Sequence, residues 1–390
     1  MGQVEQKLKE VDWDFADAPA NKGIHAIHPY PAKFIPQIPR QLIKLYHPGD
    51  KSIVLDPFCG SGTTLIEAIS LGLDAWGVDL HPLACLIARV KTTPLRPQFI
   101  QTAEEVVRRA RVRLAAGKIS VPDIPNLDHW FKIEVQKSLA ALIGEIDSLP
   151  SNPTREALRV AFSSIVVRVS NQESDTRYAA IEKTVSADHV FDLFDRAAAN
   201  ICESVFSFRD DLFRSFGKAG ILNRDILTVS PGELPKNVGL VITSPPYPNA
   251  YEYWLYHKYR MYWLGMNPIA VKEREIGARP HYFKTNHQDE TDFEKQMAAC
   301  FALLSRVMLP EAKACFLVGR SIIHGREIDN IALLKRAADP HGFEFKDTVE
   351  RHIPATRKTF NPSHGKITKE HVIVFSLACP NENPLPLAKL

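Results

Sequence analysis

The order of apolar and polar residues predicts alternating strands and helices at the start of the chain. Residues 52–58 (SIVLDPF) are a short apolar run that ends near an acid, which is typical of a buried strand. The turn CGSG follows, then a helical pattern over residues 63–72 and a second apolar strand, AWGVDL, at 75–80. Strand, glycine turn, helix and strand in this order predict half of a doubly wound α/β sheet.

The middle of the chain has a different pattern. Residues 95–220 show helical periodicity and few strand signals, and Thr102 and Glu105 have the spacing of a capping box. We therefore predict a mostly helical insertion or second domain here. Strand patterns return in the last part, with helical patterns between them, at 221–227, 239–247, 314–320, 343–353 and 371–377. The last two of these strands predict an antiparallel hairpin that ends the sheet.

Composition limits the class of protein. The chain has 390 residues, which suggests two domains or one large domain with an insertion. Its net charge of +3 neither indicates nor excludes a nucleic-acid partner. The six cysteines form no CxxC pair and the histidines have no ligand spacing, so we expect neither a metal site nor a disulfide framework. With no apolar run of membrane length and no signal-peptide pattern at the start, we expect a cytoplasmic protein.

The turn after the first strand has the residues of a cofactor site. Gly60 and Gly62 allow a ligand to approach the backbone, and the following helix offers free N–H groups. Asp79 ends the next strand, where an acid that binds ribose hydroxyls usually falls. A dinucleotide fingerprint would need glycine instead of Leu65, and no P-loop lysine is present. Asp56 would repel a pyrophosphate but suits a cationic ligand such as S-adenosylmethionine; the alternative is a plain glycine turn.

A second motif, Ser-Pro-Pro-Tyr, follows a later apolar strand. Two prolines stop the strand and fix a rigid loop at its carboxyl end, where open α/β sheets place ligands. An exocyclic amine of a nucleobase is a poor nucleophile because its lone pair is delocalised into the ring. Ser244 Oγ and the Pro245 carbonyl can accept both amine hydrogens and free that lone pair, while Tyr247 can stack on a base swung out of its duplex. The alternative is a proline-rich loop after a core strand.

Together the two motifs resemble those of the amino-methyltransferases of DNA, which use S-adenosylmethionine. DPFCGSGTT is similar to the cofactor motif of this family and TSPPY to its catalytic motif. A serine before the two prolines is typical of cytosine-N4 enzymes, whereas adenine-N6 enzymes more often have Asp or Asn. Cytosine-C5 chemistry is disfavoured because it needs a nucleophilic cysteine, typically in a Pro-Cys pair, and the chain contains no such pair.

The resemblance also implies the roles of individual residues. Residues 28–36 (HPYPAKFIP) resemble the segment that closes over the methionine end of the cofactor, and residues 223–226 resemble one that contacts its adenine ring. The implied catalytic residues are Ser244, Pro245, Pro246 and Tyr247. The implied cofactor-binding residues are Lys33, Phe34, Asp56, Pro57, Phe58, Cys59, Gly60, Ser61, Gly62, Thr63, Asp79, Leu80, Asp225 and Ile226.

Double-stranded DNA is the partner that the resemblance implies, and a cognate restriction endonuclease is left open. By analogy with the family we assign residues 95–220 to target recognition, between two halves of a catalytic domain at 1–94 and 221–390. Arginines on one predicted helix are candidate phosphate contacts or simply a solvated face, and a basic loop near the end is another candidate. The candidate DNA-binding residues are Arg108, Arg109, Arg113, Arg177, Arg357 and Lys358. Tyrosines and tryptophans at 251–263 have helical spacing, which favours packing.

The sequence thus predicts a site-specific DNA methyltransferase that transfers a methyl group from S-adenosylmethionine to cytosine N4 by direct attack. Three alternatives stay open at this point. The first is a DNA adenine-N6 methyltransferase, and the second is an RNA guanine-N2 methyltransferase. The third is a DNA-binding module that has kept the fold without the activity.

Overall fold

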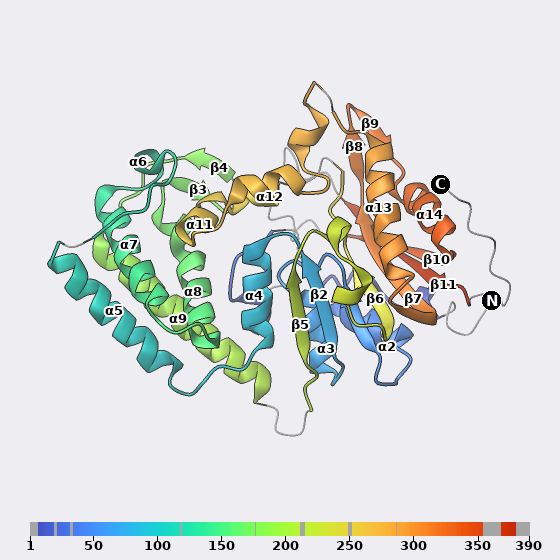
Figure 1. The fold of residues 1–390 in the computed structure, drawn as a ribbon, viewed down its shortest axis with the longest axis horizontal. Helices are drawn as coiled ribbons and strands as arrows, with labels where there is room; N and C mark the ends of the chain where they lie inside the picture. Colours follow the sequence, from blue (N-terminus) through green and yellow to red (C-terminus); the bar gives the residue numbers. More distant parts are fainter. Residues whose placement is uncertain are drawn as a thin grey trace.

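The fold is built on one seven-stranded sheet. A computed structural model describes residues 7–18, 22–31, 34–117, 119–175, 177–210, 215–248, 252–285, 287–353 and 368–379. The strand order is β10-β11-β7-β6-β1-β2-β5 (Figure 1). The strands are β1 (Ile53–Asp56), β2 (Ala75–Asp79), β5 (Ala219–Asn223), β6 (Val238–Thr243), β7 (Met308–Gly319), β10 (Phe343–His352) and β11 (Lys369–Leu377). Only β11 runs against its neighbours β7 and β10, so the predicted α/β sheet with a terminal antiparallel hairpin is confirmed.

Both faces of the sheet are buried because apolar side chains alternate between two cores. Val54 of β1 belongs to the core that includes α3 and α4, whereas Leu55, the next residue, belongs to the core under α13 and α14. Such strands read as continuous apolar runs, which is why the sequence identified them. The covering helices are α2 (Gln37–Tyr46), α3 (Thr63–Ser70), α4 (Pro82–Thr92), α13 (Glu290–Leu304) and α14 (Asn330–Ala338).

A mostly helical region lies beside the β5 edge of the sheet (Figure 1). Its helices are α5 (Phe99–Ala115), α6 (Leu127–Trp130), α7 (Ile133–Asp147), α8 (Pro153–Val169) and α9 (Ala187–Arg209). These helices confirm the helical part of the predicted fold class. Their apolar core is continuous with that of the sheet. The region also contains the hairpin of β3 (Gln172–Ser174) and β4 (Arg177–Ala180), whose strands are too short for the sequence pattern to predict.

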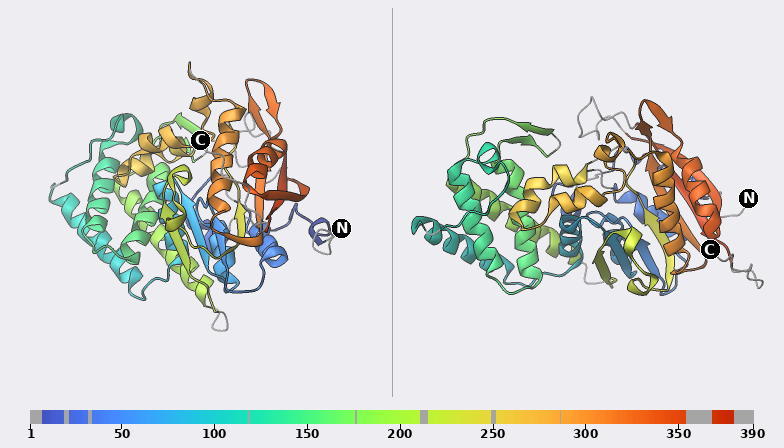
Figure 2. Two further views of the ribbon diagram at one scale, coloured as in Figure 1. Left: turned by 45° about the vertical axis from the view of Figure 1, so that its right-hand side comes forward. Right: turned by 45° about the horizontal axis from the view of Figure 1, so that its top comes forward.

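A segment after β6 crosses the top of the molecule from the helical region toward β8 and β9 (Figures 1 and 2). It contains α10 (Tyr253–Tyr256), α11 (Lys258–Trp263), α12 (Pro268–Arg274) and the 3-10 helix η4 (Arg279–Tyr282). Trp254, Tyr259 and Trp263 are buried. Trp263 meets the ring of Phe131 edge-on. Packing is therefore confirmed for these three rings, whereas Tyr253 lines a cavity described below and Tyr251 lies outside the described residues.

In the last part of the chain, after residue 220, the bounds of several helices and strands differ from the prediction. The strand hairpin of β8 (Ser321–Ile323) and β9 (Arg326–Ile328) was not predicted, and it precedes α14, which begins at Asn330. The Asp289 carboxylate accepts hydrogen bonds from the backbone N–H groups of Thr291 and Asp292 and caps the start of α13. The predicted strand at 221–227 ends at Asn223 because the Asp225 side chain caps the 3-10 helix η2 (Ile226–Thr228).

Arg260 of α11 is the group that ties this crossing segment to the helical region. It is 1% exposed and forms an ion pair with Asp175 in the β3–β4 turn. Its Nε donates a hydrogen bond to the Ser163 carbonyl of α8 at 3.0 Å. Removing Arg260 or its partners would leave charged or polar groups here without a counter-charge or a hydrogen bond.

We predict that Arg260→Met lowers the free energy of unfolding by about 3–5 kcal/mol, the usual cost of breaking a buried ion pair. Chemical denaturation measures this change. Arg196→Met is the matched control, since Arg196 is exposed on α9 and should change stability little. Equal midpoints for the two variants would contradict the structural role of Arg260.

Candidate cofactor pocket and catalytic loop

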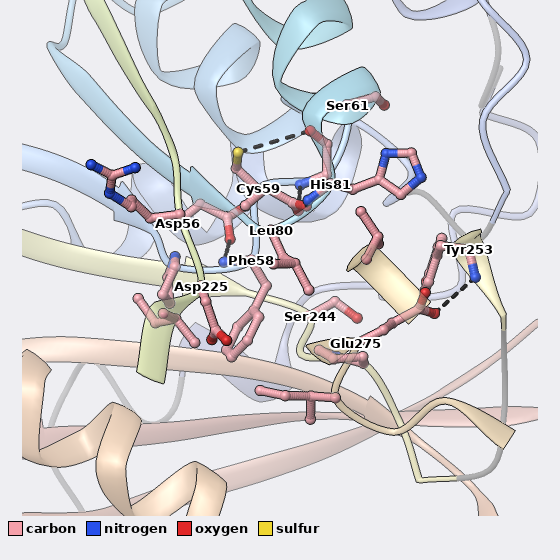
Figure 3. Close-up of a pocket in the computed structure, with 18 of the residues that line it drawn as sticks. Asp56, Phe58, Cys59, Ser61, Leu80, His81, Asp225, Ser244, Tyr253 and Glu275 are labelled. Carbon is pink, nitrogen blue, oxygen red and sulfur yellow. Dashed lines mark hydrogen bonds between the residues drawn. The ribbon is translucent and has the colours of Figure 1, made fainter. Parts of the chain in front are cut away.

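A cavity of about 900 Å³, counting its open mouth, lies at the carboxyl ends of β1, β2 and β6 (Figure 3). Doubly wound sheets bind ligands at this edge. Fourteen of the residues predicted from sequence line it: Phe34, Asp56, Pro57, Phe58, Cys59, Gly60, Ser61, Thr63, Asp79, Leu80, Asp225, Ile226, Ser244 and Pro246. The two motifs, far apart in sequence, therefore share one cavity.

The remaining predicted residues lie elsewhere. Gly62, Pro245 and Tyr247 do not line the cavity, although they adjoin residues that do. Lys33, Arg357 and Lys358 lie outside the described residues. Three further lining residues, Tyr30, Thr64 and Arg224, fall inside motifs that the sequence indicated but were not singled out, and the others are His81, Tyr253, Val271, Arg274, Glu275 and Ile276. Tyr30 falls inside the segment 28–36, so its position was a usable signal, whereas Glu275 has no sequence signal.

The glycines of the cofactor turn are required by its geometry. Gly60 and Gly62 have φ of +48° and +82°, which other residues adopt only with strain. A Cβ on Gly62 would come within 2.9 Å of the Ala88 Cβ. The turn closes through the Gly62 N–H, which donates to the Cys59 carbonyl at 2.8 Å. It therefore leaves backbone close to the cavity at the start of α3.

Two carboxyl groups, the buried Asp56 and the half-buried Asp79, give the cavity a negative character. Burial raises the pKa of Asp56 and of Asp79 to about 6 each. The Asp79 carboxylate also braces the turn, because it accepts the N–H of Gly60 at 2.8 Å and the N–H of His81 at 2.7 Å. Burial lowers the pKa of His81 to about 3, so this neighbour is neutral and does not offset the carboxylates. A cationic ligand would stabilise both anions and lower their pKa values.

One hydrogen bond joins the cofactor motif to the catalytic motif. The Thr243 hydroxyl, at the end of β6, donates to the Asp56 carboxylate at the end of β1 at 2.7 Å. Thr243 is fully buried, and Ser244 is the next residue. This contact fixes the start of the catalytic loop (residues 244–247) relative to the cofactor turn (residues 59–62).

The catalytic loop is held from two sides. The Tyr247 hydroxyl lies 3.3 Å from Ser244 Oγ and donates to Glu370 of β11 at 3.4 Å, and Glu370 is in turn paired with Arg351 of β10. On the other side Gly277, with φ of +75°, packs so closely that a Cβ there would lie 2.5 Å from the Tyr247 carbonyl oxygen. Tyr247 is therefore buried, and stacking on a base would require this side chain to move.

Glu275 forms the opposite part of the wall, near Ser244 and Tyr253 in the view of Figure 3. Its carboxylate accepts the N–H groups of Tyr253 and Trp254 at 2.8 and 3.0 Å and so holds the start of α10. Burial raises its pKa to about 8. The ring of Tyr253 stacks on that of Tyr30 at 5.9 Å, so the segment 28–31 is also held at the cavity.

The candidate DNA-binding arginines of α5 lie at the outer edge of the helical region, away from the cavity (Figure 1). Arg108 and Arg109 both pair with Glu105, and Arg113 pairs with Glu145. These ion pairs offset the positive charge that would attract phosphate. Arg177 starts β4, is exposed, and pairs with Glu173.

No group of three or more potential metal ligands occurs in the part of the chain that the structure describes. Among the same residues, no helix is long and apolar enough to span a membrane.

Comparison with known proteins shows which proteins this chain resembles. Residues 3–89, which contain the cofactor motif, match a family model described as DNA methylase. The chain is 30% identical to the Type II methyltransferase M.MvaI of Kocuria varians over 239 residues, 57% of this chain and 53% of that protein. It is 44% identical to M.MjaII of Methanocaldococcus jannaschii over 94 residues, which are 22% of this chain and 17% of that protein.

Solved structures with detectable likeness are distant. TrmN of Thermus thermophilus aligns with 88% of this chain and 49% of its own, at 14% identity and a TM-score of 0.35. A SAM-dependent methyltransferase of Methanosarcina mazei aligns with 90% of this chain and all of its own, at 10% identity and a TM-score of 0.35.

The predicted resemblance to the N6/N4 DNA methyltransferases is thus confirmed by the family match and by the relatives in sequence. The chain spans about half the length of M.MvaI. The match also supports S-adenosylmethionine as the cofactor, and the cavity fits it, because a sulfonium cation suits a site with uncompensated buried carboxylates.

We predict that Thr243→Val weakens binding of S-adenosylmethionine about 10-fold. Loss of the hydroxyl removes the hydrogen bond that stabilises the Asp56 anion, so the pKa of Asp56 rises further above 6 and less anion is present at pH 7. Isothermal titration calorimetry measures the affinity. Thr243→Ser keeps the hydroxyl and is the control, and equal affinities for the two variants would show that the bond is not needed.

A second prediction concerns pH. The pKa of Glu275 is about 8 when folded and 4.5 ordinarily, so the folded protein holds a proton there that the unfolded chain has released. The stability that this proton provides is fully present below pH 4.5 and is lost as the pH rises through 8. Melting temperatures of the wild type should therefore fall relative to those of Glu275→Gln between pH 5 and pH 9. Glu273→Gln, exposed in the last turn of α12 just before Glu275, should run parallel to wild type; parallel curves for Glu275→Gln would contradict the assignment.

Proposed function

We propose that this protein is a DNA methyltransferase that transfers a methyl group from S-adenosylmethionine to the exocyclic N4 of cytosine. The observation that carries the proposal is the Thr243–Asp56 hydrogen bond, which sets the catalytic loop and the cofactor turn at one cavity. The match of the cofactor half to DNA methylases supports the same chemistry. The serine before the two prolines supports cytosine N4 as the acceptor.

The cofactor residues would act through charge and backbone. S-adenosylmethionine, when bound, supplies a methyl group on a positively charged sulfur. Asp79 would accept ribose hydroxyls while still bracing the turn, since a carboxylate has more lone pairs than its two present bonds use. Asp56 would stabilise the cationic part of the cofactor. Phe34 would contact the methionine end of the cofactor and Ile226 its adenine ring, and Phe58 would add apolar lining; all three residues line the cavity.

The catalytic loop would activate the amine by accepting its hydrogens. Ser244 lines the cavity, and its hydroxyl can rotate to accept one N–H of the target amine. The Pro245 carbonyl would accept the other. Both bonds favour a tetrahedral nitrogen whose lone pair is free to attack the methyl group. Tyr247 positions Ser244 through their 3.3 Å contact, and it would stack on the base only after it leaves the Glu370 carboxylate.

The region 95–220 is our proposed target-recognition region, with the β3–β4 hairpin on the same side of the molecule as the crossing segment (Figure 1). Adenine N6 stays the second candidate for the acceptor, because the same two hydrogen-bond acceptors would serve either exocyclic amine. A cognate restriction endonuclease remains a prediction.

Mass spectrometry of nucleosides tests the proposal. DNA of diverse sequence is incubated with the protein and S-adenosylmethionine and is then digested. We expect N4-methylcytosine from wild type and a loss of about 100-fold or more for Ser244→Ala, the scale of removing one hydrogen-bonding group that acts in the transition state. Ser244→Ala should still bind the cofactor. Ser148→Ala, at the end of α7, is the control and should remain active.

Each result has a definite reading. N6-methyladenine that also depends on Ser244 would retain the mechanism and overturn the base assignment. Cofactor binding without any methylated base in DNA would overturn DNA as the substrate, and transfer to RNA in the same assay would support the guanine-N2 alternative.

A further inference from the structure

A tip stands out on the side of the molecule where the parallel strands end (Figures 1 and 2). Two segments that are separate in sequence form it. One is η4 with the residues after it, and the other is the β8–β9 hairpin. We call the tip the set Arg279, Phe283, Lys284, His287 and His324. The cavity-lining Ile276 lies only three residues before Arg279, so the tip continues the wall of the cavity.

Phe283 is unusual in its exposure. Its side chain is 57% exposed, more than that of any other phenylalanine among the described residues. It is nevertheless held in place: the His324 ring meets it edge-on at 5.6 Å, and His287 meets His324 in the same way at 4.9 Å. An apolar ring that is supported from behind and open to solvent in front is suited to contact a partner.

The hairpin turn explains how His324 comes to support this ring. The two-residue loop between β8 and β9 is His324–Gly325, and both residues have positive φ, at 48° and 80°. This is the type I′ geometry that joins two short strands. A histidine is an uncommon choice there, and its ring is what reaches Phe283.

The cations of the tip differ from those of α5. Arg279 and Lys284 are exposed, and Arg279 lies over the Phe283 ring at 5.4 Å. No carboxylate among the described residues lies within 4.0 Å of either cation. On α5, in contrast, Arg108 and Arg109 are paired with Glu105. Arg279 still feels the charge of Glu252, which lies beyond 4.0 Å. Exposed cations that form no ion pair are available for phosphate, and an exposed ring flanked by cations suits stacking on bases.

We propose that this tip contacts duplex DNA next to the target nucleotide, with Arg279 and Lys284 on phosphates and Phe283 against the bases. Apolar rings of this kind enter base steps in proteins that distort DNA, and a duplex from which one base has been swung out offers such a gap. The inference rests on the proposed function, since it takes the cavity as the site of the swung-out base. It adds a contact surface outside the region 95–220.

Fluorescence anisotropy with a labelled 30-base-pair duplex of mixed sequence, at several salt concentrations, tests the tip. Each neutralised phosphate contributes about 0.9 to the slope of log affinity against log salt. Arg279→Gln with Lys284→Gln should therefore reduce the magnitude of that slope by about 2 and weaken binding at least 10-fold at low salt. Arg108→Gln with Arg109→Gln is the charge-matched control and should leave the slope unchanged.

A separate variant tests the proposed contact of Phe283 with the bases. Phe283→Ala should weaken binding about 10-fold with little change in the salt slope, because stacking involves no counterion release. Phe206→Ala, exposed on α9, is the matched control. All four variants should bind S-adenosylmethionine as wild type does, which shows that they are folded.

The proposal would be overturned by tip variants that bind the duplex like wild type, or by α5 variants that lose as much affinity as the tip variants. A wild type that does not bind the duplex at all would also overturn it. Because the assay reads binding, it is separate from the proposed reaction. A tip that is needed for DNA binding, in a protein that methylates no base, would support the tip and contradict the proposed function alone.

Discussion

Desolvation of two carboxyl groups at the ends of adjacent parallel strands is the constraint on which the site depends. The sheet is covered by helices on both faces, so Asp56 is buried and Asp79 half-buried at the strand ends, and both have raised pKa values. Their partners are the fixed groups around them: backbone N–H groups of the glycine turn and the Thr243 hydroxyl. Satisfying these acceptors holds the turn open toward the cavity and sets β6 in register with β1. The remaining negative charge favours a cationic ligand.

The catalytic loop depends on the same arrangement and on two further supports. Tyr247 connects it to the reversed strand β11 through Glu370, and Gly277 lies against its backbone. Glu275 then anchors the crossing segment by accepting two of its N–H groups. The last strand of the sheet, the catalytic loop and the crossing segment are therefore mechanically connected. Tyr247 does not line the cavity, so stacking of this ring on a base in the cavity would require the side chain to leave its present position.

On the side of the molecule where the parallel strands end, one structural element stands at each end. The β3–β4 hairpin belongs to the helical region, and the basic, aromatic tip belongs to the sheet domain (Figure 1). Arg260 ties the crossing segment between them to the β3–β4 turn and to α8. A duplex that lies across this side would meet both ends, with the cavity between them. The arginine-rich face of α5 is outside this path and is neutralised by its own acidic neighbours.

The sequence by itself determined the strands, the cofactor turn and the catalytic motif, because their signals are local. Apolar runs that end in an acid, glycines that only a tight turn requires, and a double proline after a strand each depend on a few neighbouring residues. Only the tertiary structure decided what depends on distant segments. The hairpins β3–β4 and β8–β9 are too short for an alternation to be visible, and Glu275 and Gly277 reach the site through contacts with remote backbone. The α5 arginines were candidate DNA contacts in sequence, but the acids that neutralise Arg111 and Arg113 come from α9 and α7, which no local pattern reveals.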